Sequence, residues 1–99
     1  MPPIALKRHR SPEGIVIAAA DEELLGRTFH SGKLRLEVHR AFYDGERVDE
    51  QTLAQLLQVA PMANLVGERT IGVALAAGLA SEETILRIDG IPHLLLLAV

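Results

Sequence analysis

The chain has 99 residues, of which 48% are hydrophobic and 23% charged, and its formal net charge is −3. This size and composition predict one globular domain over residues 1–99. The acidic balance argues against a general nucleic-acid binder, because neutralising phosphate requires concentrated positive charge. The absence of cysteine excludes disulfides, thiolate catalysis and cysteine-ligated metal centres, and it fits a cytoplasmic protein.

The N-terminal part of the chain is predicted to form a β-hairpin. We expect strands over Ile4–Arg10 and Ile15–Ala20, joined by a turn at Ser11-Pro12-Glu13-Gly14. The second strand opens with three β-branched residues, which favour a pleated conformation.

Three consecutive acidic residues follow this hairpin. Asp21 is predicted to cap a helix of little more than one turn, with Glu22 and Glu23 at the positive end of its dipole and Gly26 ending it in a left-handed conformation. A Mg²⁺ site or acid–base chemistry is the alternative for these carboxylates. We favour capping, because it accounts for the spacing of all three residues.

The middle of the chain combines one strand with one helix. Leu34–Val38 alternates strictly between apolar and polar residues, which predicts a strand with one buried face. Asp49 is predicted to cap the next helix, and Pro61 to end it. The helix has one apolar stripe, made of Leu53, Leu56, Leu57 and Ala60.

The C-terminal part is predicted to hold a second long helix and a second hairpin. The helix starts at Gly67 or Glu68 and runs through Ala77. Asp89-Gly90 lies between the apolar runs Ile85–Ile88 and Ile91–Val99, which is a strong hairpin signal. The run Leu94–Val99 is apolar throughout, so we expect a strand that is covered on both faces or lies at an interface; a leucine helix is the alternative.

These elements together predict an α+β fold. A small mixed or antiparallel sheet, with N- and C-terminal hairpins, would pack against two main helices. Leu94–Val99, the longest strongly apolar run, is far too short to span a bilayer, so no membrane association is expected.

Several positively charged residues are candidates for binding a partner. Lys7, Arg8 and Arg10 lie in the only basic run, and Arg35 would extend it if the strand at Leu34–Val38 lay alongside. This surface could contact RNA phosphate. We favour the alternative that it is a charged edge strand, which prevents aggregation between sheets.

The segment Asn64–Arg69 leads into the start of a helix, where free amides can hold an anion. Glu68 in the first turn would repel one. We therefore expect Asn64 to hydrogen-bond within its own loop, and Glu68 and Arg69 to cap or pair locally. Asn64 and Arg69 remain candidates for contact with a partner.

No catalytic or metal-binding motif is recognisable. The four histidines lack zinc-ligand spacing, so no metal or cofactor is expected. His93 is the best candidate for handling a proton. Glu68 and Asp89 are weaker catalytic candidates.

Several motifs occur in a characteristic order along nearly the whole chain, from about Ile4 to the C-terminus. They are Asp21–Gly26, Phe29–Val38, Phe42–Gly45, Asn64–Arg69 and Gly90–His93. With these motifs the chain resembles the small archaeal proteins called domain of unknown function 424. That resemblance implies an archaeal, cytoplasmic protein with a housekeeping role, and it assigns no catalytic or binding residue. The family pattern often has cysteine where this chain has Ala20.

The sequence favours a non-catalytic binding module for a protein or ribonucleoprotein partner, such as one in archaeal translation or RNA housekeeping. One alternative is a small enzyme with a site around His93, Asp89, Glu68 and Arg69. The other is a structural homodimer formed through the C-terminal apolar strand, Leu94–Val99.

Overall fold

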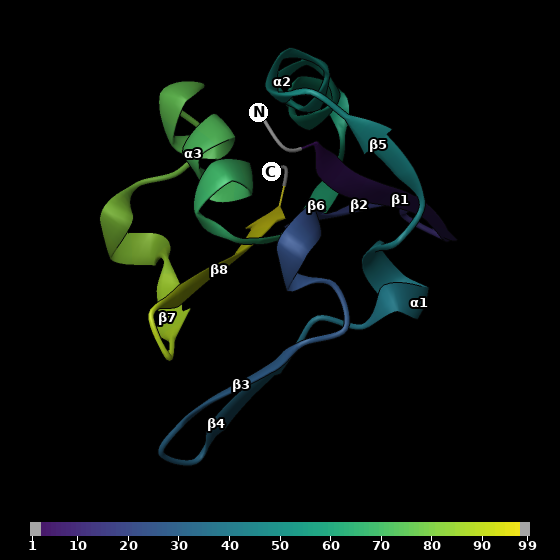
Figure 1. The fold of residues 1–99 in the computed structure, drawn as a ribbon. Helices are drawn as coiled ribbons and strands as arrows, with labels where there is room; N and C mark the ends of the chain where they lie inside the picture. The colour runs from purple at the N-terminus through teal and green to yellow at the C-terminus, as the bar shows by residue number, and fades with distance from the viewer. Residues whose placement is uncertain (1–2, 98–99) are drawn as a thin grey trace.

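The computed structural model describes residues 3–97, and its centre is a six-stranded sheet (Figure 1). The strands of this sheet are β1 (Ile4–Ser11), β2 (Gly14–Asp21), β5 (Glu46–Val48), β6 (Met62–Val66), β7 (Leu86–Ile88) and β8 (Ile91–Leu97). Their order is β5-β1-β2-β6-β8-β7. Neighbouring strands are antiparallel except β2 and β6, which run parallel.

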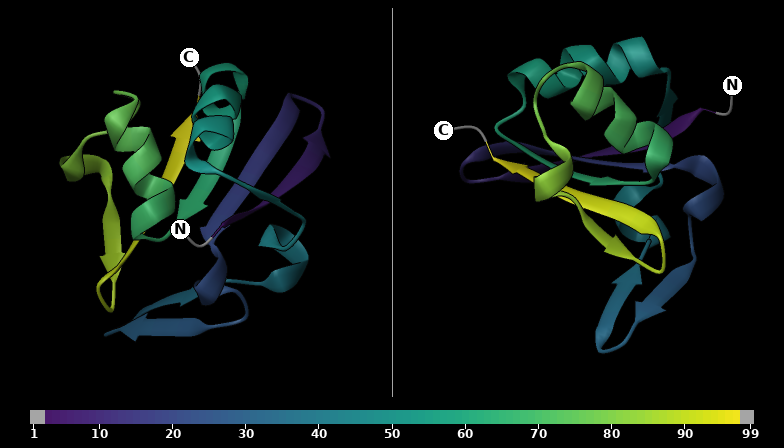
Figure 2. Two further views of the ribbon diagram at one scale, coloured as in Figure 1. Left: turned by 45° about the horizontal axis from the view of Figure 1, so that its top comes forward. Right: turned by 90° about the vertical axis from the view of Figure 1, so that its left-hand side faces the viewer.

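Two helices, α2 (Glu50–Val59) and α3 (Glu68–Ala76), cover one face of the sheet (Figure 2). Alternate strand residues point toward them, because successive side chains of a strand face opposite sides. Leucine, isoleucine and valine dominate this core, which includes Ile4, Leu6, Ile17, Leu65 and Leu94 from the strands, and Leu53, Leu57, Ile71 and Val73 from the helices.

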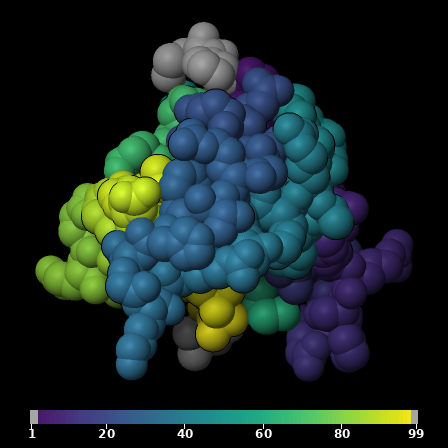
Figure 3. All heavy atoms as spheres, turned by 60° about the horizontal axis from the view of Figure 1, so that its bottom comes forward, coloured from purple at the N-terminus to yellow at the C-terminus, as the bar shows by residue number. Residues whose placement is uncertain are grey.

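The other face is covered by shorter elements that follow β2 along the chain. These are the 3₁₀ turn η1 (Glu22–Leu24), the two-stranded sheet of β3 (Thr28–Ser31) and β4 (Leu34–Glu37), and the short helix α1 (Arg40–Tyr43). The sheet offers them small residues, Ala5, Ala18 and Ala20, which let these elements approach closely. In Figure 3 the β3–β4 hairpin crosses the middle of this face, between β7–β8 and the β1–β2 hairpin.

The predicted α+β class, both terminal hairpins and both main helices are confirmed. Asp49 caps α2, since its Oδ1 accepts a hydrogen bond from the Thr52 amide at 2.8 Å. α3 ends at a left-handed Gly78, with φ 74°. A second 3₁₀ turn, η2 (Glu82–Thr84), follows it and leads into β7.

Four elements were not predicted: β3, α1, β5 and β6. The most consequential is β6, because the expectation that Asn64 lies in a loop is wrong. Asn64 lies in a strand between β2 and β8. The strand has only five residues, so its alternation is short, and asparagine is unusual in strands.

The C-terminal run is not covered on both faces within this chain, and the alternative expectation, that it lies at an interface, stays a prediction. It does form a strand, in which Leu94 is buried but Leu95 and Leu97 are 57% and 61% exposed. The last two residues of the predicted run, Ala98 and Val99, lie outside the described residues.

Candidate functional site

Asp21 caps a helix, but not the one expected. Its side chain makes no capping bond to η1. Instead its carboxylate accepts hydrogen bonds from the amides of Arg69 (3.1 Å) and Thr70 (2.8 Å) and from the Thr70 hydroxyl (2.8 Å), all in the first turn of α3. Asp21 is only 4% exposed, so the carboxylate is buried and fully engaged in holding α3 against the end of β2.

Glu22 and Glu23 lie in the first turn of η1, as expected, and they also bind distant elements. Glu22 Oε1 accepts from Arg47 of β5 at 2.9 Å. Glu23 forms a two-point ion pair with Arg69 at 2.8 and 3.1 Å. The Arg69 hydrogen bond is the main reason that the pKa of Glu23 lies below its ordinary value. All three acidic residues are therefore accounted for by structural contacts.

A polar cluster of Tyr43, Asn64 and His93 joins α1 to β6 and β8. Asn64 Oδ1 accepts a hydrogen bond from the Tyr43 hydroxyl at 2.6 Å and lies 3.0 Å from His93 Nε2. An amide oxygen can only accept, so His93 donates from Nε2 and its Nδ1 is left free to accept. Asn64 and His93 were candidates from the sequence; Tyr43, the only tyrosine in the chain, was missed.

Burial keeps this cluster uncharged at neutral pH. Desolvation raises the pKa of Tyr43 to about 12 and lowers the pKa of His93 below its ordinary value. Arg69 Nε is the only buried side-chain nitrogen or oxygen without a partner among the described residues. Asn64 Nδ2 and His93 Nδ1 have no hydrogen-bond partner in the part of the chain that the structure describes, and both residues are half-buried.

The four residues of the predicted enzyme site have separate partners. Glu68 pairs with Arg87 at 2.6 Å, and Arg69 pairs with Glu23. Asp89 lies in the β7–β8 turn with φ 53°, and its amide donates a hydrogen bond to Ser31 Oγ at 3.1 Å. Within residues 3–97, no hydrogen bond or ion pair joins His93 to Asp89, Glu68 or Arg69. No set of three or more potential metal ligands occurs in this part of the chain either.

Most of the positively charged candidates are engaged by acceptors of the protein itself. Arg35 does not extend the basic run, because β4 pairs with β3 in the separate small sheet and not with β1. Among the described residues, Arg10 is the one such candidate with no acceptor. The pairs are Lys7 Nζ with the Ala41 carbonyl at 2.8 Å, Arg8 with Glu46 at 3.0 Å, Arg35 with Glu37 at 2.6 Å, and Arg69 with Glu23 at 2.8 Å.

The edge of β8 is open beyond the end of β7. β7 pairs with Ile91–His93 only. The Pro92 carbonyl accepts from the Gly67 amide at 3.0 Å, so the backbone groups of Pro92, Leu94 and Leu96 turn toward β6. By alternation, those of Leu95 and Leu97 turn away from β6. In the part of the chain that the structure describes, no strand pairs with them there.

A hollow of about 470 Å³ lies beside this open edge, between Leu94–Leu97 and the segment Gly78–Ser81. It adjoins the strand whose outward backbone groups are unpaired. A row of free amides and carbonyls next to open space is a template for another strand. The edge therefore has the geometry to accept an extended segment.

None of the helices in the described residues could cross a bilayer, since even α2 has only ten residues.

Comparison with known proteins gives a family but no activity. No curated protein matches the chain. A solved structure, "Crystal structure of an uncharacterized conserved protein from Methanopyrus kandleri", is similar with a TM-score of 0.77 and 26% identity, over 95% of this chain and 90% of that one. The family profile described as "Protein of unknown function (DUF424)" matches residues 9–99. The chain therefore belongs to the DUF424 family, as its motifs indicated.

Proposed function

We propose that this protein is a non-catalytic binding module that takes an extended segment of a partner protein at the open edge of β8. The observation that carries the proposal is the unpaired, outward-facing backbone of Leu95 and Leu97. Natural sheets usually protect such edges with charges, proline or a covering segment. From Leu94 to Leu97 this edge has only leucine, which supports its use as an interface.

The side chains beside the edge favour the same function. Leu95 and Leu97 are 57% and 61% exposed on the face opposite α2 and α3. An added strand would gain main-chain hydrogen bonds from the edge and would bury these leucines with its own alternate side chains.

The distribution of charge favours a protein over RNA as the partner. The positively charged candidates are spread over separate elements, since Lys7, Arg8 and Arg10 lie on β1, Arg35 on β4 in the other sheet, and Arg69 on α3. An RNA-binding surface needs several free cations close together. The proposal places the protein in the cytoplasm, with which its cysteine-free composition is compatible.

The test compares Leu95→Lys with Leu34→Lys in affinity capture from native lysate of the source organism. Both leucines are exposed, and Leu34 lies on β4, away from this edge. We expect one protein to be captured by the wild type and by Leu34→Lys, with or without nuclease, and to be lost with Leu95→Lys. Capture that depends on RNA, or that Leu95→Lys leaves unchanged, would contradict the proposal.

A second candidate is a homodimer through the same edge, and the spacing of the outward residues favours it. If two copies of β8 pair antiparallel about Leu96, Leu95 of each copy meets Leu97 of the other as a hydrogen-bonded pair. The four exposed leucines would then form one cluster on one face. Edge pairing alone buries less than a standard interface, so we expect a weak, concentration-dependent dimer.

The absence of cysteine makes the dimer simple to test. In this pairing Leu96 faces its own copy in a non-hydrogen-bonded pair, with Cα atoms about 4.5 Å apart, which a disulfide can bridge. Leu96→Cys should cross-link to a dimer under mild oxidation, whereas Leu86→Cys on β7 should not. A monomer at high concentration with no cross-linking of Leu96→Cys would eliminate the homodimer and leave the edge to another protein.

A further inference from the structure

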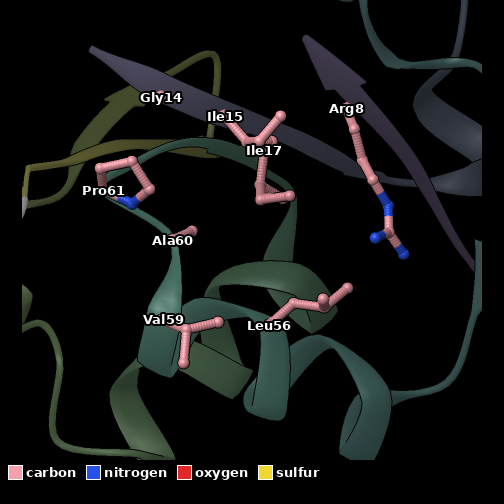
Figure 4. Close-up of a pocket in the computed structure, with 8 residues that line it drawn as sticks. All are labelled: Arg8, Gly14, Ile15, Ile17, Leu56, Val59, Ala60 and Pro61. Carbon is pink, nitrogen blue, oxygen red and sulfur yellow. The ribbon is translucent and has the colours of Figure 1, made fainter. Parts of the chain in front are cut away.

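A second surface lies on the helix-covered face, between the tip of the β1–β2 hairpin and the last turn of α2. It is an apolar hollow of about 320 Å³ (Figure 4). Ile15 and Ile17 of β2 form one wall, Leu56 and Val59 of α2 the other, and Pro61 and Arg8 lie at its two ends. The nearly all-aliphatic lining suits an aliphatic group.

Gly14 closes one end of this hollow. A Cβ at this position would lie 3.0 Å from Pro61 Cγ, which is closer than side chains normally approach. The backbone of Gly14 also has φ 124°, which other residues rarely adopt. The hairpin tip therefore lies directly against Pro61, just after α2, and the two close this end of the hollow.

The rim of the hollow is apolar and exposed. Val59 is 79% exposed and Ile15 is 37% exposed. A small molecule within the hollow would leave most of Val59 in water. A partner that lies across the rim would bury both side chains, so the rim favours a macromolecular occupant over a small one.

Two cations stand beside this apolar surface. Ile4 and Leu6 of β1 face the helices, so by alternation Arg8 and Arg10 lie on the same side. Arg10 is paired in register with Ile15, and Arg8 with Ile17. Arg8 binds Glu46 in an exposed ion pair at 3.0 Å, and such a pair can be exchanged for another carboxylate at little cost. Arg10 has no acceptor within residues 3–97.

We propose that this hollow binds a short acidic segment of a partner protein. One leucine or isoleucine of that segment enters between β2 and α2, and neighbouring Asp or Glu side chains pair with Arg10 and exchange with Glu46 at Arg8. The inference is independent of the β8 edge, because β6 lies between β2 and β8 in the sheet.

The test is selection of random displayed peptides on the full-length protein, followed by affinity measurement with the best peptide. Enriched sequences should place a large aliphatic residue next to Asp or Glu. Arg10→Glu should weaken binding by roughly fivefold or more, the scale of an exposed ion pair, and Val59→Lys should abolish it. Lys33→Glu, the same charge change at the exposed β3–β4 turn, should leave binding unchanged, and all variants should keep the wild-type melting temperature.

Four outcomes would overturn the inference. The first is no enrichment, and the second is enrichment of sequences without acidic residues. The third is a peptide whose binding is lost with Leu95→Lys, since that would place it on β8. The fourth is tighter binding of sodium octanoate, tested alone, than of the best peptide. That result would assign the hollow to a small aliphatic carboxylate. Peptide binding that is unchanged by Leu95→Lys and lost with Arg10→Glu would support the inference about this hollow, whether or not the β8 proposal is correct.

Discussion

The carboxylate of Asp21 accepts hydrogen bonds from both the amide and the hydroxyl of Thr70, at 2.8 Å each. One residue at the end of β2 thereby caps a helix that begins after β6. Both residues are buried, at 4% and 0% exposure. The contact fixes how α3 lies on the sheet, and it explains why an acidic motif that looks functional is structural.

Replacing Asp21 should destabilise the protein strongly. Asp21→Ala would leave the amides of Arg69 and Thr70 and the Thr70 hydroxyl without their acceptor, and we expect a loss of about 2–4 kcal/mol in the free energy of unfolding. Urea denaturation measures this directly. Asp49→Ala, which removes the exposed cap of α2, is the matched control and should cost clearly less. Equal losses for the two variants would contradict a special role for the buried cap.

Gly67 is required because the Asp21 carboxylate occupies the space of its missing side chain. A Cβ on Gly67 would overlap that carboxylate, and Gly67 has φ 106°. Gly67→Ala should therefore cost at least about 2 kcal/mol. Gly78 also has a positive φ, but a Cβ there would have no atom within 4 Å. Gly78→Ala should therefore cost only about 1 kcal/mol.

The two effects at Gly67 can be separated with a double variant. In the Asp21→Ala background the overlap is gone and only the strain of the backbone conformation remains, so Gly67→Ala should then cost clearly less than it does in the wild type. The pair should therefore be strongly non-additive in urea denaturation. Additive losses would mean that the carboxylate and Gly67 do not compete for the same space.

Helix caps and hairpin turns were predicted from the sequence where the residues that form them are neighbours in the chain. Asp49 capped the helix it precedes, and Asp89-Gly90 formed the predicted hairpin turn. Asp21 was predicted to cap its own turn, because sequence spacing shows only nearby amides. Its true donors lie 48 and 49 residues further along the chain. A cap supplied by tertiary contact leaves no periodic signal.

Only part of the candidate site could be predicted, because its residues also come together through contacts between distant parts of the chain. Asn64 and His93 were singled out as residues, but their contact depends on the pairing of β6 with β8, which sequence alone did not show. Tyr43 was missed because α1 has only four residues and no helical period. The basic run is visible in the sequence, but its acceptors are not. The carbonyl that accepts from Lys7 belongs to α1, and the carboxylate that pairs with Arg8 belongs to β5.

His93 should make stability depend on pH in the weakly acidic range. Burial lowers its pKa in the folded state below the ordinary 6.5, so the unfolded chain binds more protons between the two values. Stability should therefore be greatest above about pH 6.5 and should fall as the pH drops toward the folded pKa. The melting temperature across this range measures the effect, and His93→Gln should reduce it. His30→Gln, at an exposed position, is the control and should leave the profile unchanged.

Tyr43 gives a direct test of the polar cluster, because it is the only tyrosine in the chain. Burial raises the pKa of its hydroxyl to about 12 from 10.0, so near-ultraviolet absorbance of phenolate should appear only near pH 12 while the protein stays folded. The neutral form is favoured in the folded state, so its stabilising contribution is complete below about pH 10 and is lost as the pH rises toward 12. Tyr43→Phe removes the hydrogen bond to Asn64 and should cost about 1 kcal/mol at neutral pH. A phenolate that forms near pH 10 in the folded protein would show that the hydroxyl is solvated and that α1 is not held to Asn64 through it.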